Sequence, residues 1–204
     1  MPAEWFCDYG EEPGEELKNP FVQRIKSTPW KYLFSIFFIC INIRLVMDSI
    51  QFAVAATLAI WILVEMSIGD IKYRIIPDEL LVLLALTGLG FLTYRGSWQS
   101  CLLGTGIGFG VMFFVALMGK LAYKRDTVGG GDIKLFTCLG FILGPAGVIA
   151  VFMITSMVSA GHYVYLMARK RLKRTDTVPM VPYIAFASVI YLIFLYGKFD
   201  SITL

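Results

Sequence analysis

The chain of 204 residues has few of the side chains with which many soluble enzymes bind metals or act as nucleophiles. It contains one histidine, His162, and four cysteines, Cys7, Cys40, Cys101 and Cys138. The histidine lies in an apolar stretch, and the cysteines are scattered without a C-x-x-C spacing. This pattern does not support a zinc site, a His-based triad or a dithiol redox motif. We therefore expect no metal and no cofactor.

Charge is also scarce. Charged residues make up 16% of the chain and hydrophobic residues 57%, and the mean hydropathy is +0.71. These values exceed what a soluble domain of this size needs for its core, so they indicate an integral membrane protein, with the lipid bilayer and not a nucleic acid as its surroundings. Apolar stretches of about 17 to 25 residues suffice to cross a bilayer. We expect an all-α, polytopic transmembrane helix bundle of six to seven spans, near 32–47, 49–69, 78–94, 100–119, 133–144, 145–168 and 180–197.

The first 31 residues have a different composition, with acidic residues followed by basic ones. They lack the short apolar core and the small-residue cleavage site of a secretory signal. We expect 1–31 to be a cytosolic tail and 32–204 a membrane-embedded domain.

Basic residues in short loops predict the orientation, because such residues concentrate on the cytoplasmic side of a membrane. They follow the second, fourth and sixth predicted spans, at Lys72 and Arg74, at 120–125 and at 169–174. The intervening loops are poor in charge. The N-terminus and these three loops are therefore expected to face the cytoplasm.

The sequence Gly-Asp-Ile-Lys occurs twice, at 69–72 and 131–134, each time at the edge of an apolar segment. Ionisable groups near bilayer depth are costly and mark candidate functional sites. In the predicted topology Asp70 ends a span that reaches the cytoplasmic face, and Asp132 begins a span that leaves it. Both carboxylates are therefore expected at the same face.

Two carboxylates at one membrane face allow three interpretations. If they lie close together, they share a proton, and one can activate water while the other polarises a carbonyl. With other oxygen ligands nearby they could bind Mg²⁺ or Ca²⁺. They could also be interfacial helix-end residues, a role that suits Asp132 at a helix start better than Asp70 at a helix end.

Three segments resemble the type IV prepilin peptidases and the related preflagellin peptidases, which are membrane aspartic proteases of the GxGD type. Gly129–Leu135 with Leu139–Gly140 is similar to the second aspartate motif of that family. Asp70–Asp78 is similar to the stretch around the first catalytic aspartate, and Val181–Phe186 resembles the segment that opens the last helix. The resemblance extends from about residue 50 to 197.

This resemblance implies that Asp70 and Asp132 are the catalytic residues and that the enzyme cuts pilin-like precursors at the cytoplasmic membrane face, between a short basic leader and an apolar helix. Three glycines before Asp132 remove side-chain bulk and permit positive φ angles. Pro77 suits the first turn of a helix, and Asp78 suits the start of that helix. The residues expected to support the site or its loops are Gly129, Gly130, Gly131, Lys72, Lys134, Pro77 and Pro182.

The chain departs from the larger bacterial members of that family. Those enzymes carry a cytosolic segment with paired cysteines and also methylate the new N-terminus, whereas this chain has no such pairs. We therefore expect a compact peptidase without methyltransferase activity. Small-residue pairs among the glycines at 104, 106, 108 and 110 would allow a homodimer.

Two other functions remain open at this stage. One is a transporter or ion-binding scaffold, which would distribute its acids across the depth of the bilayer. The other is a metal-dependent transferase acting on lipid phosphates, which would need more acids in a tight ligand spacing.

Overall fold

The computed structural model describes residues 30–47, 49–92, 97–124, 128–169 and 178–196. The regular secondary structure of these ranges is entirely helical, which confirms the all-α prediction. Residues 1–29, most of the predicted tail, lie outside the described ranges, as do parts of the loops at 120–125 and 169–174. The elements are α2 (Trp30–Val46), α3 (Ile50–Tyr73), α4 (Asp78–Thr87), η2 (Gly88–Phe91), α6 (Trp98–Tyr123), α7 (Gly130–Ala168), α8 (Val181–Ile190) and η3 (Tyr191–Leu195).

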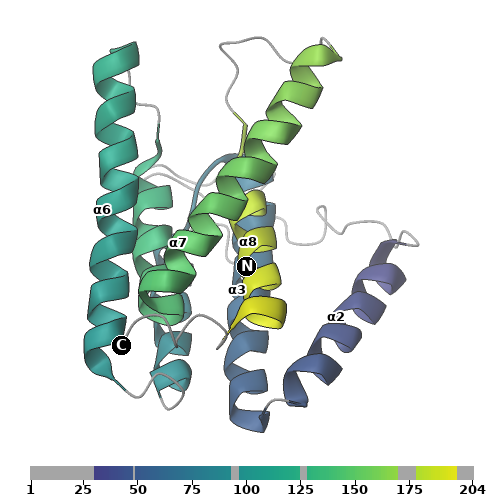
Figure 1. Ribbon diagram of the computed structural model, residues 1–204. Coiled ribbons are helices and arrows are strands. Elements are labelled where there is room, and N and C mark those ends of the chain that lie inside the picture. The colour runs from purple at the N-terminus through teal and green to yellow at the C-terminus, as the bar shows by residue number, and fades with distance from the viewer. Residues whose placement is uncertain (1–29, 48, 93–96, 125–127, 170–177, 197–204) are drawn as a thin grey trace, which may run out of the picture.

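Helix α7 turns back on itself at Gly144. The backbone there is non-helical, with φ 70° and ψ −171°, a conformation open essentially to glycine alone. The rings of Phe136 and Phe152 lie 5.9 Å apart, whereas on a straight helix these residues would be separated by about 24 Å. The two arms of α7 therefore run side by side (Figure 1). This hairpin confirms that 133–144 and 145–168 are separate segments, as the sequence predicts.

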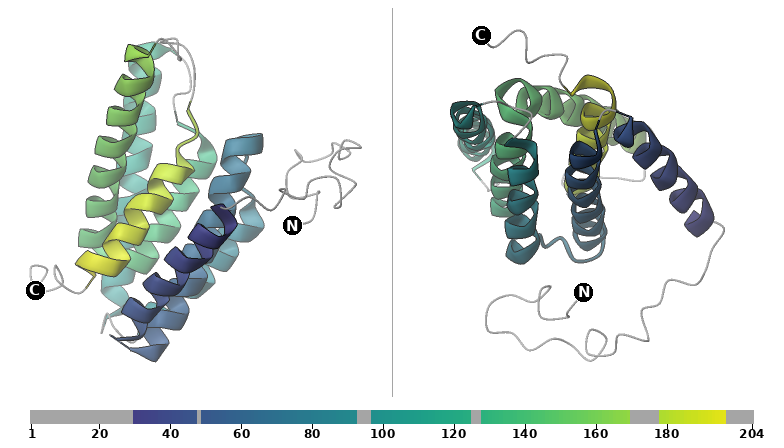
Figure 2. Two further views of the ribbon diagram at one scale, coloured as in Figure 1. Left: turned by 90° about the vertical axis from the view of Figure 1, so that its right-hand side faces the viewer. Right: turned by 90° about the horizontal axis from the view of Figure 1, so that it is seen from below.

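Successive segments alternate in direction. Asn42 of α2 contacts Thr57 of α3, and Phe38 lies 6.0 Å from Trp61, so α2 and α3 are antiparallel. After η3, Tyr196 lies 4.6 Å from Phe52, near the start of α3. We call the opposite end, where α3 ends and α4, α7 and α8 begin, the upper end of the bundle (Figures 1 and 2).

Glycines allow the backbones of α6 and α7 to touch. A Cβ atom at Gly104 would lie 2.2 Å from the carbonyl oxygen of Gly140, and one at Gly108 would lie 2.3 Å from that of Phe136. By contrast, a Cβ atom at Gly106 would meet nothing within 4 Å. One predicted small-residue pair, at 104 and 108, therefore packs inside the chain, and the other faces outward.

The outer surface of the bundle is apolar. Helices α3, α6 and α7 are long and apolar enough to cross a membrane, and α6 exposes large side chains such as Leu102, Phe114 and Leu121. The interior between α3, α4, α7 and α8 is filled by fully buried residues that include Leu63 and Leu135. This arrangement is that of an all-α membrane helix bundle.

Candidate active site

Asp70 lies in the last turn of α3, and only 7% of its surface is exposed. Its Oδ2 accepts a hydrogen bond of 2.9 Å from the backbone N–H of Val181, the first residue of α8, and the N–H of Met180 also contacts it. The end of its own helix disfavours a carboxylate, but the N-terminus of α8 favours one. The sequence indicates that the segment beginning at Val181 is part of the resemblance, but it does not predict this hydrogen bond.

Asp132 lies in the first turn of α7, at the upper end of the bundle. It is the third residue of the helix, and its carboxylate contacts the backbone N–H of Gly129, the N-cap. This is the return half of a capping box, in which an acid at the third position binds the N–H of the cap. The predicted helix-start position of Asp132 is confirmed.

The fold brings the two aspartates together from distant parts of the sequence. Asp70 ends α3 and Asp132 begins α7, and Gly131, directly before Asp132, lies against Ile76 in the loop that follows α3. The N–H of Val181 binds Asp70 and the N–H of Gly129 binds Asp132, so a backbone donor holds each carboxylate in place. Such a pair can share a proton and activate a water molecule.

The glycines before Asp132 do not adopt the positive φ angles that the sequence suggested. Gly129 has φ −68° and ψ 144°, and Gly130 and Gly131 belong to α7. Within the described residues, Gly144 is the one glycine with positive φ. The lack of a side chain matters instead at Gly131, where a Cβ atom would lie 3.0 Å from the Cβ of Ile76, in the loop that follows α3.

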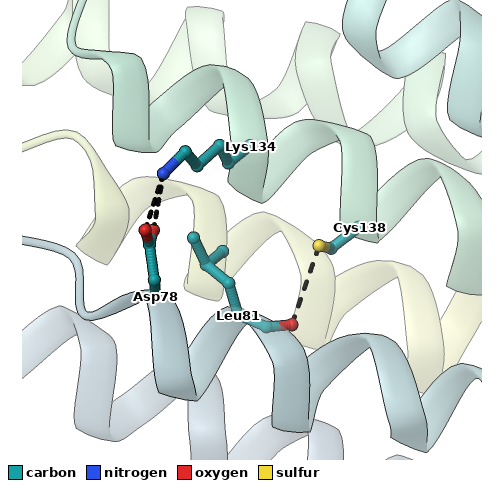
Figure 3. A network of polar contacts seen from close by, with 4 residues as sticks. All are labelled: Asp78, Leu81, Lys134 and Cys138. Carbon is teal, nitrogen blue, oxygen red and sulfur yellow. Dashed lines mark hydrogen bonds and ion pairs between the residues drawn. The ribbon is translucent and has the colours of Figure 1, made fainter.

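The two lysines of the repeated sequence lie in different surroundings. The Nζ of Lys134 donates to both carboxylate oxygens of Asp78, at 2.7 and 2.8 Å, and so joins α7 to the start of α4 (Figure 3). The thiol of Cys138, one turn further, points to the carbonyl oxygen of Leu81 at 3.7 Å. Lys72 is exposed in the last turn of α3.

The two prolines mark the starts of α4 and α8. Pro77 is buried and occupies the N-cap of α4, one residue before the first turn in which it was expected. Asp78 begins α4, as predicted, and Pro182 is the second residue of α8. Glu65, the other acid of α3, accepts a hydrogen bond of 2.8 Å from the indole N–H of Trp61 on the same helix.

The described residues contain no group of three or more His, Cys, Asp or Glu side chains that could hold a metal ion. The two backbone groups that bind Asp70 are N–H donors, which bind a carboxylate and cannot act as metal ligands.

Comparison with protein families gives a match to the type IV leader peptidase family over residues 57–164, more than half of the chain. The matched region contains both Asp70 and Asp132 and ends before α8. No solved structure matches.

Comparison with individual proteins gives relatives named prepilin leader peptidase/N-methyltransferase. The protein of Bacillus subtilis (strain 168) is 32% identical over 149 residues, 72% of this chain and 56% of the relative. That of Aeromonas hydrophila is 32% identical over 151 residues, 73% of this chain and 51% of the relative. That of Xanthomonas campestris is 31% identical over 140 residues, 67% of this chain and 47% of the relative. The chain thus spans about half the length of these relatives.

Proposed function

We propose, from the premise that this chain belongs to the type IV leader peptidase family, that it is a membrane aspartic endopeptidase acting on pilin-like precursors. These include prepilin-like and preflagellin-like proteins, from which it removes the short basic leader. The observation that carries this proposal is the pairing of Asp70 with Asp132 at one end of an apolar bundle.

The chemistry follows from two carboxylates that share one proton. The ionised aspartate takes a proton from a water molecule, whose oxygen attacks the carbonyl carbon of the scissile bond. The protonated aspartate polarises the carbonyl oxygen, and a proton then passes to the leaving amine. The N–H groups of Val181 and Gly129 orient the two carboxylates. This route requires neither a metal nor a covalent intermediate.

The site is assigned to the cytoplasmic face of a multi-pass membrane protein. Described basic residues gather toward the upper end of the bundle, whereas Arg44 lies toward the other end of α2. Such an asymmetry supports a cytoplasmic upper end. The residues concerned at the ends of α3, α6 and α7 are Lys72, Arg74, Lys120, Lys124 and Arg169.

The proposal covers the peptidase reaction alone. The names of the relatives include an N-methyltransferase activity, which is a statement about those proteins. The mass of the processed precursor separates the two reactions, because methylation adds to the mass of the new N-terminus.

The test is co-expression of the chain with pilin-like precursors from the same genome, followed by mass spectrometry of the precursors in isolated membranes. The proposal predicts loss of the leader, and it predicts that the reaction persists with a chelator present. An inserted protein that cleaves none of the precursors would contradict the peptidase assignment and favour a transporter or scaffold. Cleavage that a chelator abolishes would contradict the two-aspartate mechanism.

A further inference from the structure

An apolar groove opens between α2, α3 and α8. It has a volume of about 480 Å³. It exists because α2 contacts α3 but leans away from α8, which leaves one face of α8 uncovered (Figures 1 and 2). We call it the α2–α8 groove, and the residues that define it here are Phe37, Cys40, Ser67, Ile68, Pro182 and Phe186.

One end of the groove lies at the candidate active site. Ser67 and Ile68 precede Asp70 within a single turn of α3. On the other wall, Pro182 directly follows Val181, whose N–H binds the carboxylate of Asp70. An occupant of the groove would therefore reach the aspartates at the end of its path.

The groove continues along α8 and η3 to Phe194. From Pro182 to Phe194 the helix rises by about 18 Å, which is more than half of a hydrocarbon core about 30 Å thick. This length matches about twelve residues of a second helix that lies antiparallel or parallel to α8.

The side chains that line the groove favour an apolar occupant. The lining side chains are hydrocarbon or aromatic apart from Ser67, Cys40 and Arg44, and several are widely exposed, such as Phe186 at 53%. A basic leader would lose hydration in such surroundings without gaining a partner. The apolar helix of a precursor has no such cost and would pack its side chains against these walls.

We propose that the α2–α8 groove holds the first turns of the precursor's apolar helix, so that the bond before this helix lies at Asp70 and Asp132. The inference rests on the proposed function and adds a binding surface to it. It also explains the position of the cut, because the groove ends where the aspartates begin, and the leader that precedes the helix then remains at the upper end.

The native cysteine in the groove supplies the test. Cys40 is exposed and lines the groove. In the full chain, Cys7, Cys101 and Cys138 are replaced by alanine and Asp132 by asparagine, so that Cys40 is the single cysteine and the precursor stays uncut. Precursors with one cysteine at successive positions of the apolar helix are then cross-linked to it in membranes.

The expected result is a cross-link from Cys40 to precursor positions spaced three to four residues apart, the period of a helix that presents one face. The matched control replaces Cys40 by serine and Leu103 by cysteine. Leu103 is exposed on α6, on another part of the bundle, and its cysteine should give no periodic cross-link. Equal cross-linking from both positions, or no cross-link from Cys40 to any position of the apolar helix, would overturn the groove assignment.

A kinetic measurement separates the groove from the reaction itself. Ile68→Trp narrows the groove, so we expect kcat/KM for a full-length precursor to fall about tenfold or more, because its helix loses van der Waals contacts with the groove walls. The fall should be much smaller for a short peptide without the apolar helix, because such a peptide does not use the groove. Leu103→Trp is the control and should cut both substrates normally.

A negative result in these experiments contradicts either the groove assignment or the peptidase proposal, depending on which assay fails. If the wild type cuts precursors but neither cross-linking nor Ile68→Trp distinguishes the groove from the α6 surface, the groove assignment is wrong and the peptidase proposal stands. If the wild type cuts no precursor, the proposed function fails and this inference fails with it.

Discussion

The two aspartates each take a hydrogen bond from the N-terminal end of a helix. Asp70 binds the N–H of Val181 at the start of α8, and Asp132 binds the N–H of Gly129 at the start of α7. Hydrogen bonds to charged groups are stronger than those between neutral groups. These backbone donors fix the two carboxylates while leaving their other oxygen lone pairs available for water.

The N–H of Val181 can be removed without changing its side chain. Incorporation of the α-hydroxy acid analogue of valine at this position replaces the amide by an ester and deletes the donor to Asp70. A hydrogen bond to a charged group contributes about 1.5–3 kcal/mol, so we expect the cleavage rate to fall about tenfold or more. Normal valine incorporated by the same method is the control. An unchanged rate would show that Asp70 does not depend on this contact.

The glycines before Asp132 offer a matched pair of substitutions. A Cβ at Gly131 would press against Ile76, whereas a Cβ at Gly130 would meet nothing within 4 Å. Gly131→Ala should displace the start of α7 or the loop after α3, at a cost of about 1–3 kcal/mol. We expect it to slow cleavage and lower the thermal stability, while Gly130→Ala does neither. Equal behaviour of the two variants in both assays would contradict this packing.

At the scale of helices, the sequence predicts the segments better than their contacts. The apolar stretches predict separate segments at 133–144 and 145–168, and the structure shows the turn between them at Gly144. Hydropathy also predicts a span near 180–197, and α8 begins within it at Val181. Hydropathy cannot predict that the start of α8 lies beside Asp70. The hydrogen bond from Val181 to Asp70 joins residues 111 positions apart and depends on how α3, α7 and α8 pack.

The close contact between α6 and α7 depends on the glycines that lie on the side of α6 next to α7. Gly104→Ala would place a methyl group against the backbone of α7, so the helices must separate, at a cost of about 1–3 kcal/mol. Gly106→Ala has open space and exchanges glycine for a better helix former. We expect only Gly104→Ala to lower the unfolding temperature of the detergent-solubilised protein. A loss with Gly106→Ala instead would contradict the helix register.

At the scale of the whole molecule, the bundle converts two distant sequence segments into one site. The repeated Gly-Asp-Ile-Lys pattern and the charge distribution were sufficient to select Asp70 and Asp132 and to predict that they lie at one end. The pattern and the charge distribution do not predict the contacts of the residues beside these two aspartates. Lys134 pairs with Asp78, since the start of α4 lies beside α7, and this proximity is visible only in the folded chain.

The same arrangement accounts for the apolar surroundings of the site. Asp70 and Asp132 lie at the ends of helices long and apolar enough to cross a membrane, and the α2–α8 groove reaches the same end of the bundle. A substrate with a polar leader and an apolar helix matches this surface, because the leader would lie at the aspartates and the helix in the α2–α8 groove. The central claim is that hydrolysis depends on both aspartates together.

The most direct measurement of that claim is precursor cleavage by Asp70→Asn and Asp132→Asn, compared with wild type and with Glu79→Gln. Asparagine keeps the shape of aspartate but cannot share a proton in this way, and Glu79 is an exposed acid in the first turn of α4. The account predicts that both asparagine variants insert normally and leave the leader uncut, whereas Glu79→Gln cuts like the wild type. Cleavage by an inserted Asp70→Asn or Asp132→Asn variant at the wild-type rate would contradict it.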